Sequence, residues 1–234
     1  MRSDDSTKSF LTRGLIYLEG ENRVTRKERM PTESDSMPEA EVTLRLAFWL
    51  LNRSDGKTHA DVAIDGAHVR ISGHEQQGKW VEERVVFDIR DFLESNGCHA
   101  KNLTDEWRGT YTFEGHSLEI KSASGFDVKV RCKDKYIKAE CKGGPFQPKR
   151  DKVAAIYAIA IMQAILSGLN AESEELWVAV PDSPAFESYG RRILRSSVFA
   201  RVGITIALVG RSGVRILRYS VGPVFEGRVD WLPS

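Results

Sequence analysis

Apolar and charged residues alternate most clearly between residues 126 and 142. In the first half of this stretch three apolar residues alternate with three charged ones: Phe126, Val128 and Val130 with Asp127, Lys129 and Arg131. A period of two is typical of a half-buried β-strand. Residues 136–142 form a second candidate strand, and the polar residues 133–135 between the two suit a turn. The pattern therefore predicts a β-hairpin.

Longer apolar stretches predict helices. Residues 38–51 are apolar on most sides, which indicates a substantially buried helix with Ser36 as its N-cap and Pro38 in its first turn. Residues 151–166 are rich in alanine, so this second helix is expected to pack closely on a sheet. Two further helices are predicted, over residues 89–95 after an Asp88 cap and over residues 186–199.

Strand-like runs complete the predicted fold class. Asp65-Gly66 lies between two alternating runs, residues 60–64 and 67–71, and is a strong hairpin signal. Residues 117–121 are expected to form the strand next to the one that carries Asp127. The other predicted strands are residues 109–113, 175–181, 202–209 and 214–217. Helices and strands in this order predict an α/β fold with a central mixed sheet flanked by helices.

Composition narrows the function classes only a little. The chain has 234 residues and a net charge of +1, so any nucleic-acid surface must be local. Its three cysteines, Cys98, Cys132 and Cys141, show no CxxC spacing, so the sequence indicates neither a disulfide framework nor a zinc site. A reducing cytoplasm is the expected location. No signal-like apolar start is present, and residues 153–166 are short for a membrane span, so no membrane association is expected.

The residues that could act in catalysis lie on the predicted hairpin. Glu140 and Lys142 are two residues apart on a strand, so their side chains share one face, separated by roughly 6.6 Å along the strand. Asp127 on the neighbouring strand is expected to reach the same face. Two carboxylates and a lysine in this position suit a hard cation beside an attacked phosphate. The spacing of His59, His68 and His74 is uneven, and we expect no metal site there.

This arrangement resembles the PD-(D/E)XK nuclease superfamily. The resemblance consists of Asp127, then Glu140-Cys141-Lys142 with a glycine pair, and then a long helix. Acid-x-Lys tripeptides occur four times, at Asp55-Lys57, Glu119-Lys121, Asp127-Lys129 and Glu140-Lys142. Only the last closes a hairpin that an acidic residue opens and leads through glycines into a helix. Phe126 stands where the family pattern has proline.

The resemblance implies a restriction-endonuclease-like core over about residues 80–218. Residues 38–75 are then expected to form an N-terminal helix-hairpin extension within a single nuclease-like domain, 38–234. Residues 1–37, which include a strand candidate at 11–18, are expected to be a flexible N-terminal segment.

The resemblance also implies an activity. The chain would be a Mg²⁺-dependent endodeoxyribonuclease, with Mn²⁺ as a substitute metal, that hydrolyses DNA phosphodiester bonds to a 5′-phosphate and a 3′-hydroxyl. Asp127, Glu140 and the Cys141 carbonyl would bind the metal, and Lys142 would assist the attacking water. The Cys141 side chain is expected to point into the core.

Further site residues follow from the same resemblance. Lys149 and Arg150 would contact the substrate, and Gln163 matches a glutamine that many members carry on this helix. An upstream helix often supplies another acid in the superfamily; the candidates are Glu82, Glu83 and Glu94. An arginine face is a further candidate for phosphate contacts, formed by Arg191, Arg192 and Arg195.

Other functions remain open at this level. A non-catalytic nucleic-acid-binding or scaffolding protein could keep the same fold, and RNA or another phosphodiester is an alternative substrate. No helix-turn-helix, zinc finger or basic zipper is evident in the sequence. A homodimer is expected if both strands of a duplex are cut, and residues 42–51 offer apolar surface for an interface if they are not used in the core.

Overall fold

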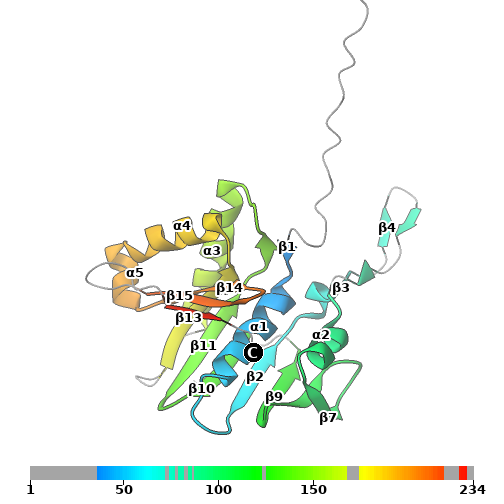
Figure 1. Cartoon of the computed structure of the whole chain (residues 1–234). Helices are drawn as coiled ribbons and strands as arrows, with labels where there is room; N and C mark the ends of the chain where they lie inside the picture. The colour runs from blue at the N-terminus through cyan, green and yellow to red at the C-terminus, as the bar shows by residue number, and fades with distance from the viewer. Residues whose placement is uncertain are drawn as a thin grey trace, which may run out of the picture. The chain divides into compact units, whose positions relative to one another are not determined.

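The computed structural model describes residues 36–218 and 227–230, apart from 72–73, 77–78, 82–83, 86, 123–124 and 168–173. It confirms a mixed α/β fold, with a large mixed sheet flanked by helices (Figure 1). The strand candidate at 11–18 and the rest of the predicted N-terminal segment up to residue 35 lie outside the described residues. None of the described helices combines the length and apolarity that crossing a membrane requires.

Among the described residues, the main sheet has ten strands: β2 (His59–Ala63), β7 (His99–Leu103), β8 (Gly109–Phe113), β9 (His116–Lys121), β10 (Val128–Cys132), β11 (Lys135–Cys141), β13 (Glu174–Pro181), β14 (Thr205–Gly210), β15 (Gly213–Leu217) and β16 (Gly227–Asp230). Their order is β16-β15-β14-β13-β11-β10-β2-β9-β8-β7. The pairs β11–β13, β13–β14 and β2–β9 are parallel and the others antiparallel.

Short strands also pair outside the main sheet: β1 (Ser36–Met37) with β12 (Gly144–Pro145), β3 (Arg70–Ile71) with β6 (Arg84–Val85), and β4 (His74–Gln76) with β5 (Lys79–Val81). The first of these pairs joins the segment that enters the first helix to the segment that follows the hairpin. It therefore holds together two parts of the chain that are far apart in sequence.

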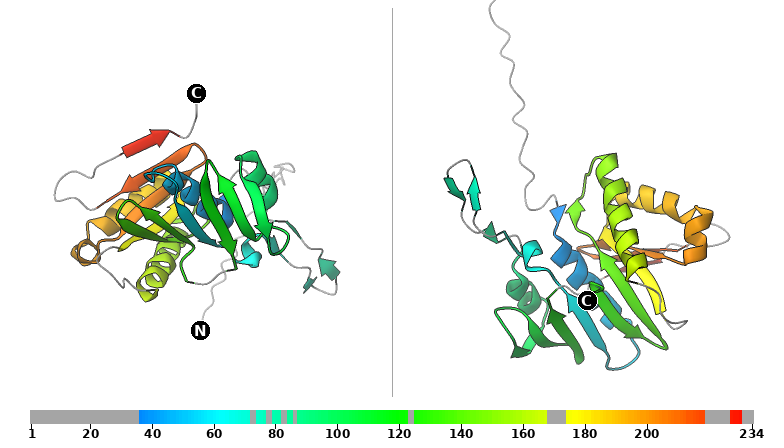
Figure 2. Two further views of the ribbon diagram at one scale, coloured as in Figure 1. Left: turned by 90° about the horizontal axis from the view of Figure 1, so that it is seen from below. Right: turned by 180° about the vertical axis from the view of Figure 1, so that it is seen from behind.

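Helix α1 (Glu39–Leu51) is enclosed by the sheet, as its apolar residues on most sides predict. It contacts β10, β11, β2, β13, β14 and β15, and Phe48 stacks on Phe113 of β8 with 4.5 Å between ring centroids. Burial of nearly every position along α1 makes it the centre of one core layer (Figure 2). The predicted N-cap is wrong: Ser36 lies in β1, and Pro38 precedes the first helical residue.

The opposite face of the sheet carries α3 (Arg150–Leu166) and α4 (Pro184–Leu194), which pack over β11, β13, β14 and β15. The helix predicted over residues 186–199 is two helices, α4 and α5 (Ser197–Val202), because the chain turns at Arg195–Ser196. The short helix α2 (Ile89–Ser95) is confirmed, and Asp88 caps it by accepting from the Asp91 N–H at 3.0 Å.

The hairpin predicted around Asp65-Gly66 is wrong. β2 pairs with β10 and β9, and Asp65 instead caps the 3₁₀ helix η2 (Gly66–His68) by accepting from the Ala67 N–H. An aspartate that bonds a backbone N–H two residues ahead directs the chain into a helical turn. Because β2 lies inside the main sheet and α1 in its core, residues 38–75 do not form a separate helix-hairpin extension.

The predicted neighbour of the strand after Asp127 is also wrong. β9 forms at residues 116–121, close to the prediction, but β2 lies between it and β10. The hairpin β10–β11 itself is confirmed, with Val128 opposite Ala139 and Cys132 opposite Lys135. Local alternation predicts this hairpin, whereas the position of β2 depends on long-range pairing.

Candidate functional site

Three carboxylates from three elements surround the ammonium of Lys142. Its Nζ lies 2.8 Å from Glu140 Oε1, 3.4 Å from Glu39 Oε1 and 4.0 Å from Asp127 Oδ2. Glu140 belongs to β11, Asp127 immediately precedes β10, and Glu39 begins α1. We call these four residues the carboxylate cluster. The structure thus brings together the predicted Asp127, Glu140 and Lys142 and adds Glu39.

The hairpin register places Asp127 beside the end of β11. Val128 is opposite Ala139, so Asp127 falls beside Glu140 and Cys141. Its Oδ2 accepts the Cys141 N–H at 2.7 Å, and its backbone carbonyl accepts the Ala63 N–H of β2 at 2.8 Å. Backbone contacts from two neighbouring strands therefore hold Asp127 in position.

Gly143 explains how Glu39 reaches the cluster. A Cβ at Gly143 would lie 2.4 Å from Glu39 N and 2.8 Å from Met37 O, closer than real Cβ contacts allow. Only a glycine lets the backbone after Lys142 pass this close to the start of α1. The β1–β12 pair, in which Met37 is opposite Gly144, strengthens the same contact. Gly143, the first of the two glycines after the tripeptide, thus allows the start of α1 to lie against Glu140-Cys141-Lys142.

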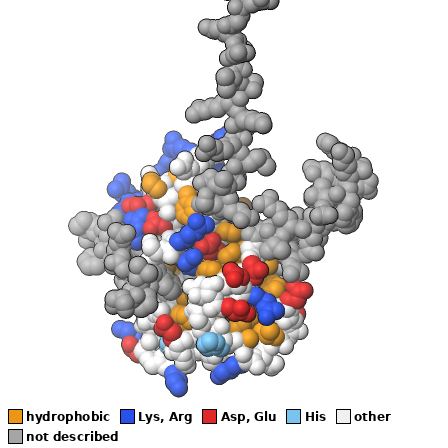
Figure 3. All heavy atoms as spheres, turned by 45° about the vertical axis from the view of Figure 1, so that its right-hand side comes forward, with side chains coloured by type: hydrophobic (Ala, Val, Ile, Leu, Met, Phe, Trp, Pro, Cys, Tyr) orange, Lys and Arg blue, Asp and Glu red, His pale blue; other side chains and the backbone are white. Residues whose placement is uncertain are grey.

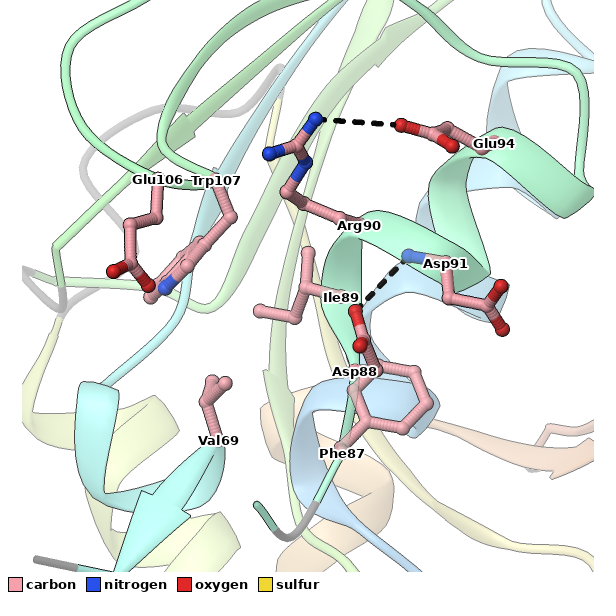
Figure 4. A pocket seen from close by; sticks show the side chains of 9 residues that line it. All are labelled: Val69, Phe87, Asp88, Ile89, Arg90, Asp91, Glu94, Glu106 and Trp107. Atoms are coloured by element: carbon pink, nitrogen blue, oxygen red, sulfur yellow. Dashed lines mark hydrogen bonds and ion pairs between the residues drawn. The ribbon is translucent and has the colours of Figure 1, made fainter.

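Sequence reasoning missed Glu39. The signal that was available is its position directly after Pro38, in the first turn of the most buried predicted helix. The predicted upstream acid Glu94 lies elsewhere, on α2, where it pairs with Arg90 at 3.7 Å. It lines a separate hollow of about 500 Å³ with Asp88 and Trp107 (Figure 4). Glu82 and Glu83 lie outside the described residues.

The carboxylate cluster is largely buried, with Glu140 the most enclosed of its four residues. Only 4% of the Glu140 side chain is exposed, and 15% of each of the other three. Burial, and then the negative charge of Glu140, raise the pKa of Asp127 to about 7. Burial also raises the pKa of Glu140, although the hydrogen bond from Lys142 opposes the shift.

Lys142 keeps its proton in this setting. Burial alone would lower the pKa of its ammonium, but the hydrogen bond to Glu140 and the charges of Glu39 and Asp127 raise it overall. One ammonium faces three carboxylates, so the cluster attracts a further cation. Cys141 turns the other way and is fully buried, as expected, and burial raises the pKa of its thiol well above the usual range.

The predicted substrate residues are divided between two ends of α3. Lys149 and Arg150 are exposed at its start, shortly after the cluster in sequence. Gln163 is exposed thirteen residues beyond Arg150, roughly 20 Å along the helix axis. On the face drawn in Figure 3, the described acidic and basic side chains are interspersed. The arginines of α4 are partly engaged, since Arg191 pairs with Glu187 and Arg192 covers the Tyr189 ring.

The rival tripeptide Glu119-Lys121 forms a second polar group on β9 and β2. Lys121 Nζ lies 2.8 Å from Asp61 Oδ1 and 3.2 Å from Glu119 Oε2, and His59 is adjacent. Ligand atoms of His59, Asp61 and Glu119 lie within 4.8 Å of one another. These side chains are 37–46% exposed, and Lys121 already pairs with both carboxylates. Surface ion pairs of this kind are common, so the buried carboxylate cluster is the stronger candidate.

No family model, curated protein or solved structure matched this chain.

Proposed function

We propose that this protein is a metal-dependent endonuclease of the PD-(D/E)XK type that hydrolyses DNA phosphodiester bonds. One observation carries the proposal: Asp127, Glu140 and Lys142, which the sequence pattern selects, meet in a single buried cluster together with Glu39. The mixed sheet with α1 on one face and α3 on the other supports a restriction-endonuclease-like core.

The cluster fits a divalent metal. Carboxylates of Asp127, Glu140 and Glu39 supply hard oxygen ligands. Burial, and then the negative charge of Glu140, raise the pKa of Asp127, and a bound cation would offset both effects. The Cys141 carbonyl is a fourth candidate ligand, since its peptide lies against Asp127. Mg²⁺, or Mn²⁺ in its place, would supply a polarised water and stabilise charge on the attacked phosphate.

Lys142 acts in this proposal as a cationic donor. Its raised pKa keeps the ammonium charged at neutral pH, so it orients the attacking water and offsets negative charge as the phosphorus becomes pentavalent. Its hydrogen bond to Glu140 and its contact with Glu39 fix the ammonium before substrate binds. Asp127, held by the Cys141 N–H, needs little rearrangement to receive a cation.

Substrate would approach along the exposed basic side chains that follow the cluster in sequence. Lys149 is the N-cap of α3 and makes no side-chain capping bond, and Arg150 is the first residue of the helix. Both are exposed, and phosphate contacts by both would make binding depend on salt. A cytoplasmic location and a homodimer that cuts both strands belong to the same proposal. Residues 42–51 belong to α1 and, apart from Arg45, are buried in the core, so they would not form that interface.

The test is a cleavage assay on plasmid, single-stranded DNA and RNA with Mg²⁺, Mn²⁺ or EDTA. We expect cleavage of DNA only with metal, and loss of activity in Glu140→Gln and Lys142→Met. The matched controls are Glu119→Gln and Lys121→Met, which alter the exposed acid-x-Lys tripeptide and should keep the parental rate. If the protein bound nucleic acid but cleaved none of these substrates with either metal, the proposed nuclease activity would be wrong, and a non-catalytic nucleic-acid-binding protein would be the better description.

A further inference from the structure

Helix α3 has an apolar face that the described elements leave exposed. Between Val153 and Leu166, all of which the structure describes, Gln163 is the only exposed polar side chain. The exposed apolar residues are Ala155, Ala158, Ile159, Met162, Ile165 and Leu166. Tyr157 and Ala164, on the opposite side of the helix, pack in the core under the sheet. α3 is therefore apolar on nearly all sides, a pattern typical of a helix that has neighbours on both faces.

The spacing of the exposed apolar residues matches a seam between two helices. Four of them follow one another at intervals of four, three and four residues: Ala155, Ile159, Met162 and Leu166. We call these four residues the α3 stripe. A repeat of 3.5 residues is the one by which a helix packs its side chains between those of a second helix. The stripe therefore fits another helix.

The exposed face is large enough for an interface. The exposed fractions of Leu166, Met162, Ile159 and Ile165 are 77%, 54%, 53% and 43%. With the two alanines, they present roughly 500 Å² of apolar surface, a size that on one molecule often marks an interaction site. Pairing two such faces would bury on the order of 1,000 Å², the size at which specific interfaces begin.

Charge at the two ends of α3 favours an antiparallel partner helix. Lys149, Arg150 and Lys152 lie at its start with Asp151 among them, and its last turn carries no basic residue. Two parallel copies would place their basic starts side by side, which is unfavourable. An antiparallel copy instead brings its C-terminal carbonyls, the negative end of its helix dipole, near Lys152.

Side-chain size favours the same orientation. When two copies of the stripe are aligned antiparallel about its middle, Leu166 of one copy lies opposite Ala155 of the other. Ile159 of one copy then lies opposite Met162 of the other. A large side chain thus meets a small one at each end of the seam, which allows the two helices to approach closely.

We infer that the α3 stripe is the surface on which two copies of this chain pair, antiparallel about a twofold axis at the middle of the stripe. Such an axis lets one stripe serve both copies. The inference rests on the homodimer of the proposed function and supplies its interface, which α1 does not offer because it lies in the core. Pairing needs neither metal nor DNA, so a failure of pairing is distinguishable from a failure of cleavage.

The first test measures the molar mass of the full chain in EDTA by analytical ultracentrifugation, from low to high micromolar concentration. We expect a monomer–dimer equilibrium that Met162→Glu weakens by about tenfold or more, because the new charge would be buried in the seam. Val198→Glu is the matched control, since Val198 is 64% exposed on α5, outside the stripe, and the dimer should be unchanged. Circular dichroism confirms folding. A monomer at every concentration, or a dimer that Met162→Glu leaves intact, would overturn the inference.

The second test determines the orientation by disulfide formation. In the antiparallel pair, positions 155 and 166 of different copies lie opposite each other, so the double variant Ala155→Cys/Leu166→Cys should form a covalent dimer on oxidation. Neither single variant should do so beyond the level of the parent, which carries three free cysteines of its own. A covalent dimer from Ala155→Cys alone would indicate parallel helices and overturn the antiparallel arrangement.

Discussion

At the scale of single residues, Asp127 shows the strongest conflict between stability and proposed chemistry. Its carboxyl is buried beside Glu140, which raises its pKa to about 7 from an unperturbed 3.8. The folded protein therefore binds more protons than the unfolded chain between these two values. The contribution of Asp127 to the stability of the metal-free protein is therefore lost as pH rises through this window, because folding then requires a buried negative charge. Such strain at a site is compensated when a cation binds.

Asp127→Asn should remove that penalty. Asparagine keeps an oxygen that can accept the Cys141 N–H but carries no charge. In EDTA at pH 8 we expect a higher Tm than the parent, by roughly 2–4 °C for each kcal/mol gained, and little difference at pH 4. Thermal unfolding followed by circular dichroism across this pH range measures it.

Asp61→Asn is the control for this prediction. Burial alone would raise the pKa of Asp61, but the hydrogen bond from Lys121 lowers it overall, so its charge stabilises the fold. Asp61→Asn should not raise Tm at pH 8. A Tm of Asp127→Asn equal to or below the parent at pH 8 would contradict the proposed strain.

Lys142 is the second residue on which the chemistry depends. If it is a cationic donor, Lys142→Met should lower the cleavage rate by roughly 10²–10³-fold, the usual loss of one preorganised donor. Metal affinity should be retained, because the three carboxylates remain. Glu140→Gln should instead weaken metal binding by removing a ligand oxygen. Initial rates at saturating Mg²⁺ and Mn²⁺ titration calorimetry separate the two effects, and a parental rate in Lys142→Met would refute the role.

At the scale of elements, the joint between β11 and α1 decides whether the cluster is complete. Gly143 passes so close to Glu39 that the two elements must move together. Two further contacts stabilise this joint. One is the β1–β12 strand pair, and the other is the hydrogen bond that the Lys142 N–H donates to the Ala179 carbonyl of β13. A helix start, a strand end and a glycine therefore act as one unit that positions two carboxylates and a lysine.

Gly143→Ala should disrupt that unit. Its Cβ would meet backbone atoms, which cannot rotate away, so we expect a stability loss of roughly 1–3 kcal/mol and loss of cleavage as Glu39 is displaced. The adjacent Gly144→Ala is the control, since its Cβ would meet only side-chain atoms of Ile156 and Phe186 at 3.3 Å. Urea denaturation and cleavage rates compare the two. Similar behaviour of both variants would show that Glu39 needs no such close joint.

At the scale of the whole molecule, α1 and β2 connect the two halves of the sheet. β2 joins β10 to β9, and α1 fills the core layer over the sheet, where its Phe48 stacks on Phe113 of β8 and Phe92 of α2. Without them Asp127 would lose the Ala63 N–H on its backbone carbonyl, and the apolar side chains around α1 would face water. The molecule has a single cooperative core in this view, of which residues 38–75 are an essential part.

A chain that begins at residue 80 tests that view. It retains Asp127, Glu140 and Lys142, but we expect no cooperative thermal transition and no metal-dependent cleavage, because its main core layer is missing. The full-length protein, which should unfold in one sharp transition, is the reference. Cooperative unfolding of the shortened chain would show instead that residues 80–218 form a core that folds independently.

The sequence by itself determined the hairpin and the three residues on it. Strand alternation and the turn at residues 133–135 are local properties, and Asp127 to Lys142 span too few residues for other pairings to compete. Helix α3 followed in the same way from its apolar run. Only the tertiary structure placed Glu39, which is 103 residues from Lys142, and inserted β2 between β9 and β10. Such contacts depend on long-range strand pairing and on the close approach of the backbone at Gly143, which no local pattern indicates. The hairpin signal at Asp65-Gly66 failed for the same reason, because β2 pairs with β10 and β9 instead.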